Sequence, residues 1–254
     1  MVSPLKVWLE AEGRLLRLRL NQPKANLIDG SMMAALHTAF AEHVNGTITA
    51  VLLDAAGPNF SFGASVEEHL PENCTYMLRS IHRLILRMLS STVPILVAVR
   101  GQCLGGGLEV AMAGHIMFVS PDAVLGQPEI KLGVFAPAAS CLLPELIGHS
   151  RAIELLLSGR GITGRDAVAI GLAHNVDADP ERAAVSYFEE HLKTKSASSL
   201  NFAIQASRFD FCERVKAKIE TVERIYLDEL MATDDAIEGL DAFIKKRPAR
   251  WNHR

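Results

Sequence analysis

The sequence has no apolar run long enough to cross a membrane. No stretch in its 254 residues approaches the roughly 18 consecutive apolar positions that a membrane-spanning helix needs. The N-terminal residues carry charges where a signal peptide needs an apolar core. We therefore expect a cytoplasmic protein that makes no membrane contact.

The chain also has few cysteines, and they are far apart. Cys74, Cys103, Cys141 and Cys212 form no Cys-x-x-Cys pair, and no cluster of histidine or cysteine has the spacing of a zinc site. We expect free, buried thiols and no bound metal. Cys103 and Cys141 lie near the candidate site described below, but no nearby histidine has an evident pairing role that would make either a nucleophile.

A strong charge of either sign is missing as well. The formal net charge is -3, and charged residues make up 22% of the chain without forming a block. A nucleic-acid-binding domain normally shows a basic patch, so we expect no nucleic-acid partner. Hydrophobic residues make up 49%, which is ample for a buried core in one domain, or in one domain plus a small appendage.

Residues 93–146 contain the most informative pattern that is present. The apolar run Ile95–Val99 is short and rich in branched side chains, which is typical of a strand buried on both faces. After it come Gly105, Gly106 and Gly107, and then a segment of good helix formers. The predicted order is strand, glycine turn, helix.

Glycines at a helix start let another group approach the free N–H donors there, where the helix dipole favours negative charge. A developing oxyanion is such a group. Glu109 lies in the first helical turn, and Glu129 follows 20 positions later. If the chain folds back, the two carboxyl groups meet beside the donors, as acid–base chemistry at a carbonyl requires. A glycine triplet is more often a plain turn and such a glutamate a capping residue, so spacing alone leaves both interpretations open.

Three spaced motifs relate the chain to a known family. Gly-Gly-Gly-x-Glu occupies residues 105–109, Gly-Gln-Pro-Glu residues 126–129, and Phe-x-x-Gly-Ala residues 60–64. In this order they resemble the crotonase, or enoyl-CoA hydratase, superfamily, and the resemblance extends from about residue 15 to the C-terminus. It implies an α/β fold, a crotonase-like spiral of ββα units with a C-terminal helical trimerisation module.

The resemblance also implies roles for individual residues. Glu109 and Glu129 are the expected catalytic pair, and the backbone N–H groups of Ala64 and Gly106 are the expected oxyanion hole. The family often has aspartate after that alanine, whereas this chain has Ser65, and the sequence leaves the consequence open. The expected contacts to coenzyme A are Lys24, Ala25, Ala64, Val66, Phe243 and Lys246. The last two match a Phe-x-x-Lys pattern near the end of the chain, where an exposed charged terminus is the alternative.

The segment at residues 132–140 departs from the family pattern. Many relatives have a glycine-rich run here, whereas this chain has Phe135, Ala136 and Pro137 followed by Ala-Ala-Ser. Replacing glycines with alanine and proline stiffens a loop and adds apolar bulk. We expect these residues to form a rigid apolar pocket wall that suits a cyclic acyl group better than a long flexible one. His69 is a further pocket candidate, although a packed or solvated histidine is more frequent.

Residues 6–20 alternate as a hairpin with one solvent-exposed face, on which Arg17 and Arg19 lie. Residues 75–91 repeat apolar side chains at helical spacing. Thr163 followed by Asp166 resembles a capping box.

From residue 180 onward the pattern is wholly helical, with one helix opening at residue 196 and a separate long helix over residues 211–231. This change of character divides the chain into a crotonase-like α/β core, residues 1–195, and a C-terminal helical oligomerisation region, residues 196–254. The resemblance implies a homotrimer or a hexamer made of two trimers.

The predicted function is addition of water to a double bond conjugated with a CoA thioester. Within the superfamily, residues 60–69 and 131–148 look closest to the branch that hydrates a ring diene thioester in anaerobic breakdown of aromatic acids. Coenzyme A enters as part of the substrate, so no separate cofactor is expected. The alternatives are a straight-chain enoyl-CoA hydratase or isomerase and, in another class, a non-catalytic acyl-CoA binder or an RNA-associated relative.

Overall fold

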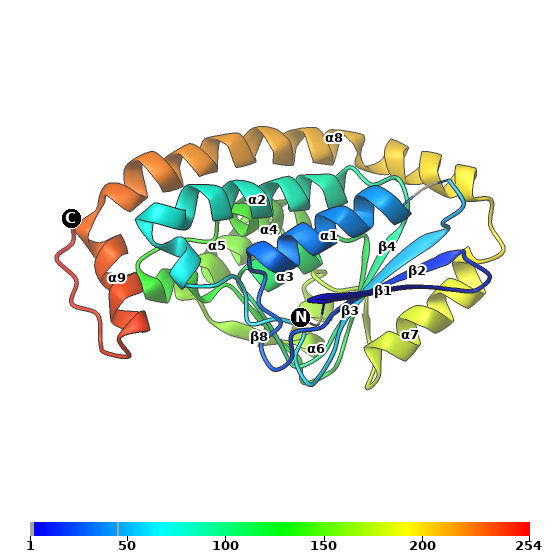
Figure 1. The fold of residues 1–254 in the computed structure, drawn as a ribbon, viewed down its shortest axis with the longest axis horizontal. Coiled ribbons are helices and arrows are strands. Elements are labelled where there is room, and N and C mark those ends of the chain that lie inside the picture. The colour runs from blue at the N-terminus through cyan, green and yellow to red at the C-terminus, as the bar shows by residue number, and fades with distance from the viewer. Residues whose placement is uncertain (1–2, 45) are drawn as a thin grey trace.

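The computed structural model describes residues 3–44 and 46–254, and a six-stranded sheet lies at its centre (Figure 1). The strand order is β1-β2-β3-β4-β6-β9, in which β1 and β2 are antiparallel and every other neighbouring pair is parallel. The strands of this sheet are β1 (Leu5–Glu10), β2 (Leu15–Leu20), β3 (Ala50–Ala55), β4 (Ile95–Val99), β6 (Ile116–Val119) and β9 (Asn175–Val176).

Helices cover both faces of this sheet. On one face α1 (Gly30–His43) and α2 (Pro71–Leu89) pack against Val51 and Leu53, and on the other α7 (Pro180–Tyr187) lies over Leu52. Successive side chains of a strand point to opposite faces, so this arrangement buries every residue of β3 and β4. The predicted doubly buried strand at Ile95–Val99 is confirmed with the same bounds.

The predicted hairpin at the N-terminus is confirmed, but its exposed face is not. Arg17 is only 3% exposed and donates hydrogen bonds to Asp54 and Glu181, each at 2.6 Å. The expectation that Arg17 faces solvent was wrong because α7 covers this face and supplies the carboxylate of Glu181. The alternation of charge along β2 therefore marks a buried ion-pair network.

A smaller sheet has the order β5-β7-β8 and makes the fold a spiral. Its strands are β5 (Gln102–Leu104), β7 (Val124–Gly126) and β8 (Gly161–Thr163). The chain passes from β4 to β5 and on to α3 (Gly106–Met112), and then from β6 to β7 and on to the short 3-10 segment η2 (Pro128–Leu132). The first passage is a ββα unit, as the family resemblance implied, and the second has a 3-10 segment in place of the helix. The short strands of the second sheet were not predicted.

The remaining helices extend from the core to the C-terminus. They are α4 (Pro137–Ile147), α5 (His149–Ser158), α6 (Gly164–Ala169), α8 (Ala197–Arg224) and α9 (Asp234–Ile244), with the short helical segments η1 (Glu67–His69), η3 (Phe188–Leu192), η4 (Ile225–Glu229) and η5 (Leu230–Ala232). The predicted capping box at Thr163 is present at the start of α6. Within the described ranges no helix is long and apolar enough to span a membrane.

Two predicted helix boundaries were wrong. Helix α2 begins at Pro71 and not at residue 75, because proline suits the first helical position, where no N–H partner is needed. The C-terminal segment is one 28-residue helix, α8, where two were expected. No glycine or proline interrupts it, and Val215 and Ile219 bury its middle in the core. In Figure 1 it runs above α2 along most of the molecule.

Candidate active site

Seven of the residues selected from the sequence line one small cavity. Its volume is about 20 Å³. The selected residues on its wall are Ala64, His69, Gly106, Glu109, Glu129, Phe135 and Pro137. The other lining residues are Met77, Leu78, Ile81 and Tyr226. The fold therefore gathers side chains from α2, α3, η2, the start of α4 and η4 at one point.

The predicted amide donors lie against each other on this wall. A Cβ atom added to Gly106 would lie 3.3 Å from the Ala64 backbone nitrogen, and one added to Gly63 would lie 3.0 Å from the carbonyl oxygen of Leu104. Gly63 has a φ of +102°, which a residue with a side chain rarely adopts. Neither the Ala64 nor the Gly106 amide donates to an acceptor within residues 3–44 and 46–254. Two adjacent backbone donors are thus free beside the cavity.

Glu109 projects from the first turn of α3 and is 4% exposed. Its carboxylate Oε1 accepts a 2.8 Å hydrogen bond from the backbone N–H of Ala139. Burial raises the pKa of Glu109, and the N–H groups of Ala139 and Ala138 oppose that rise. These donors belong to the N-terminal turn of α4, so the prediction that residues 137–140 form a loop was wrong. Proline at the first helical position starts a helix that points at the carboxylate.

Glu129 lies in η2 and lines the same cavity as Glu109. The amide nitrogen of Gln127, in the orientation that satisfies its neighbours, donates to both carboxylate oxygens at 3.2 Å. Gly105 has a φ of +50°, and a Cβ atom there would lie 2.5 Å from the Glu129 Oε1. Burial raises the pKa of Glu129, and the nearby charge of Glu109 raises it further. The pair therefore favours holding one proton between them.

The comparison with family models decides which group this arrangement belongs to. The model described as enoyl-CoA hydratase/isomerase matches residues 10–254. The chain belongs to this family. The predicted superfamily is thereby confirmed.

Individual relatives agree with the family assignment. The chain is 59% identical over 253 residues to the cyclohexa-1,5-dienecarbonyl-CoA hydratase of Thauera aromatica, covering 99% of this chain and 98% of the relative. A crystal structure of an enoyl-CoA hydratase/isomerase from Pseudoalteromonas atlantica superposes with a TM-score of 0.83 at 26% identity, covering 98% and 99% of the two chains. An enoyl-CoA hydratase from Mycobacterium avium subsp. paratuberculosis superposes at 0.86 with 22% identity, covering 99% and 100%, and shows the shared fold.

The hydratase/isomerase fold places the remaining pocket candidates at different depths. His69 lines the cavity, and its ring Nδ1–H donates to the Ser65 carbonyl oxygen at 2.8 Å, while burial lowers the pKa of the ring. Phe135 and Pro137 also line it, whereas Ala136 is buried in the main core and is absent from the wall. The Ser65 carbonyl thus orients a neutral histidine beside the site.

The expected coenzyme A contacts lie outside the cavity, apart from Ala64. Ala25 is close to the Ala64 loop, because its carbonyl oxygen accepts a 2.9 Å hydrogen bond from the N–H of Phe62. Lys24 is exposed and Val66 is partly buried. Phe243, which is 54% exposed, and Lys246 lie at the end of α9 and are not brought to the cavity within this chain.

Tyr226 is a cavity residue that sequence reasoning missed. It is 1% exposed and comes from η4, directly after α8. Its ring contacts Phe135 edge to face, with centroids 5.3 Å apart. In the sequence it is one apolar position in a long helical pattern, and no local signal distinguishes it from an ordinary core residue.

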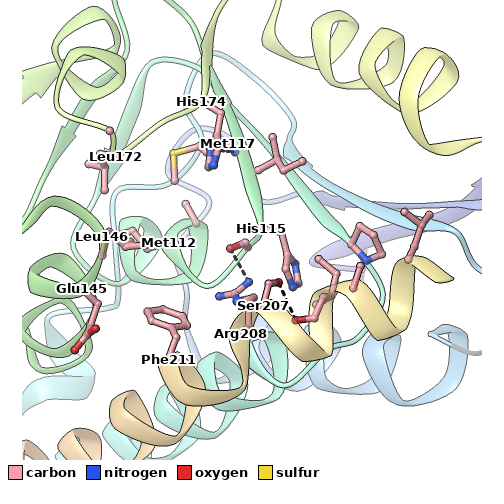
Figure 2. Close-up of a pocket in the computed structure, with 18 of the residues that line it drawn as sticks. Met112, His115, Met117, Glu145, Leu146, Leu172, His174, Ser207, Arg208 and Phe211 are labelled. Carbon is pink, nitrogen blue, oxygen red and sulfur yellow. Dashed lines mark hydrogen bonds between the residues drawn. The ribbon is translucent and has the colours of Figure 1, made fainter. Parts of the chain in front are cut away.

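A larger cavity, of about 590 Å³, lies elsewhere, between the starts of β4 and β6 and the first half of α8. Figure 2 shows His115, Arg208 and Phe211 on its wall together with Met112 and Leu172. Neither catalytic candidate lines it. Its one carboxylate, on Glu145, is paired with Arg214 and Lys218. This cavity therefore lacks an acid–base pair.

The thiol alternative finds no support in the described part of the chain. Burial raises the pKa of the Cys103 thiol, and it raises the pKa of Cys141 to about 12, which is the opposite of activation. No group of three histidine, cysteine, aspartate or glutamate side chains is placed to hold a metal ion among these residues.

Proposed function

We propose that this protein adds water to a carbon–carbon double bond conjugated with the thioester of an acyl-CoA, as a hydro-lyase that needs no cofactor beyond the coenzyme A of its substrate. The observation that carries the proposal is the cavity where Glu109 and Glu129 meet beside the free amides of Ala64 and Gly106. Membership of the enoyl-CoA hydratase/isomerase family supports it.

The two amides are assigned to the thioester oxygen. Addition of hydroxide to the conjugated double bond moves negative charge onto that oxygen and forms an enolate. The N–H groups of Ala64 and Gly106 stabilise this charge as an oxyanion hole. Removing one such donor typically costs about 2.7–4 kcal/mol of transition-state stabilisation.

The two carboxyl groups are assigned opposite roles. Glu109 accepts the proton of the attacking water, and Glu129, held neutral, donates a proton to carbon. The backbone donors of α4 at Glu109 and the repulsion that Glu109 exerts on Glu129 support this assignment. They make Glu109 the more acidic member of a pair that shares one proton.

The proposed acyl group is the cyclohexa-1,5-diene-1-carbonyl ring. The relative named for this substrate is 59% identical over nearly the whole of both chains. The wall of the cavity supports it, since Phe135 and Tyr226 form an aromatic pair there and Pro137 begins a rigid helix in place of a flexible loop. A flat ring packs against such a wall better than a flexible acyl chain does.

A hydration assay tests the function and the substrate together. Purified protein is given cyclohexa-1,5-diene-1-carbonyl-CoA and crotonyl-CoA in parallel, and kcat/KM is measured for both. We expect preference for the ring thioester; preference for crotonyl-CoA would contradict the ring assignment and favour an ordinary hydratase. Migration of the double bond without hydration would favour an isomerase.

The Glu109→Gln variant separates an enzyme from a non-catalytic binder. It should lose turnover and still bind the CoA thioester in a calorimetric titration. The matched control is Glu154→Gln, which changes a carboxylate on the exposed surface of α5 and should leave turnover intact. Full turnover in Glu109→Gln would place the chemistry elsewhere.

We also propose that Lys24, Ala25, Val66, Phe243 and Lys246 contact coenzyme A, the last two across a subunit boundary.

That boundary belongs to a homotrimer or a hexamer, which we propose is assembled by residues 196–254. Two observations support assembly. Phe202 and Phe209 on α8 are 70% and 69% exposed, and large exposed apolar side chains on one element favour a protein contact. Phe243 and Lys246 are exposed in the single chain.

A further inference from the structure

The hydroxyl of Tyr226 makes no hydrogen bond within the described residues, although its side chain is 1% exposed. Buried hydroxyl groups are normally paired, and leaving one unpaired costs about 1–3 kcal/mol. The ring is held firmly, by the edge of Phe135 and by a cluster that includes Cys74, Leu78 and Leu240. The fold therefore holds in a fixed place a residue of the cavity lining whose hydroxyl is unpaired.

The cavity itself indicates what this hydroxyl contacts. A volume of about 20 Å³ suffices for one water molecule, which needs at least about 10–15 Å³ and two to four polar partners. Glu109, Glu129 and Tyr226 supply polar groups to the wall, whereas Met77 and Ile81 supply only apolar atoms. Burial and the nearby Cys74, Glu129 and Glu109 raise the pKa of Tyr226, so the phenol stays protonated and can donate.

We propose that Tyr226 is a positioning residue whose hydroxyl donates a hydrogen bond to the oxygen of the attacking water, an inference that rests on the proposed hydration. The water then gives one hydrogen bond to Glu109 and uses one lone pair for Tyr226. Its second lone pair is left to attack the substrate carbon. Tyr226 gains and loses no proton. In the reverse direction the same hydroxyl donates to the departing hydroxide.

The test is Tyr226→Phe, which removes one oxygen atom and keeps the ring against Phe135. We expect kcat to fall about 10- to 100-fold, the size of effect that misplacing a reactant produces. KM should stay within about two-fold, because the ring wall is unchanged. The melting temperature should not fall, since the hydroxyl removed bonds no other group among the described residues.

The matched control is Tyr187→Phe, a half-buried tyrosine that also makes an edge contact, with Phe118, but lies on α7 away from the cavity. It should keep the kcat of the parent protein. The pH profile of Tyr226→Phe should keep its shape, because the two glutamates still set both limbs.

Three outcomes would overturn the inference: undiminished kcat in Tyr226→Phe, a loss confined to KM, or a loss matched by a lower melting temperature. Undiminished kcat together with an inactive Glu109→Gln would reject the role of Tyr226 and leave the hydratase proposal standing. A parent protein that hydrates no enoyl thioester would reject the hydratase proposal itself.

Discussion

At the scale of single residues, the proposed chemistry depends on two carboxyl groups with unequal surroundings. Glu109 accepts backbone N–H groups from α4, whereas Glu129 has the Gln127 amide and the repulsion of Glu109. Both are displaced toward the protonated form by burial. The same residue type thus acquires two different acidities from its position in the fold.

The pH dependence of the rate should reflect this pair. We expect a bell-shaped profile of kcat/KM, because hydration needs one member ionised and the other protonated. The pKa of both groups is raised, so both limbs should lie above the ordinary glutamate value of about 4.3. Rates measured across the pH range check this, and an acid limb at the ordinary glutamate value would contradict it.

Glu129 should also lower the stability of the fold at high pH, where its carboxyl group is ionised. A carboxyl whose pKa is raised by folding stabilises the fold below its unfolded pKa and loses that contribution as pH rises through the folded pKa. Glu129→Gln should therefore melt at a higher temperature than the parent at about pH 9, with a smaller difference at about pH 5. Thermal melts at both pH values measure it, and a variant that is less stable at the higher pH would contradict the assignment.

At the scale of elements, a buried ion-pair network ties the sheet to α7. Asp54 on β3 is 1% exposed and accepts hydrogen bonds from Arg17 and Arg19 on β2, each at 2.6 Å. Glu181 at the start of α7 contacts the same two arginines. The network closes the sheet face that the hairpin pattern alone would leave in water.

Removing the centre of this network should destabilise the protein. Asp54→Ala removes the most deeply buried carboxylate of the network from both Arg17 and Arg19, which keep Glu181, and breaking a buried pair typically costs about 3–5 kcal/mol. Urea unfolding measures the change. Glu154→Ala, which breaks an exposed pair with Arg160, is the control and should have no measurable effect. A similar small effect from both variants would show that the network contributes little.

At the scale of the whole molecule, α8 carries the exposed side chains that support the proposed assembly. Its middle packs on the core through Val215 and Ile219, while Phe202 and Phe209 remain on the surface. A helix that buries one part and exposes two phenylalanines in another is suited to a contact with a second chain. The site lies beneath the end of this helix, since Tyr226 follows it directly.

Replacing both exposed phenylalanines should weaken the assembly. We expect Phe202→Ser combined with Phe209→Ser to lower the mass found by size-exclusion chromatography with light scattering, because apolar contact area is lost. Glu220→Ser, an exposed polar position on the same helix, is the control. A parent protein that is already monomeric, or an unchanged mass in the double variant, would contradict assembly through this surface.

Prediction from the sequence succeeded where the signal was local. The strand Ile95–Val99, the capping box at Thr163 and the glycine turn before α3 each depend on residues adjacent in the chain, and each is present. The helix start at Pro137 was missed, although its signal was also local. The prediction of a loop at residues 137–140 followed the glycine-rich run of the family. It overlooked the preference of proline for the first helical turn.

By itself the sequence determined the family, the buried strand Ile95–Val99 and the choice of Glu109 and Glu129 as candidates, because motifs and periodicity are properties of neighbouring positions. Only the tertiary structure decided that Arg17 is buried, that α4 points its first amides at Glu109 and that Tyr226 reaches the cavity. Each of these depends on contact between residues far apart in the chain. Such contacts arise when packing brings the elements together, and no local pattern encodes them.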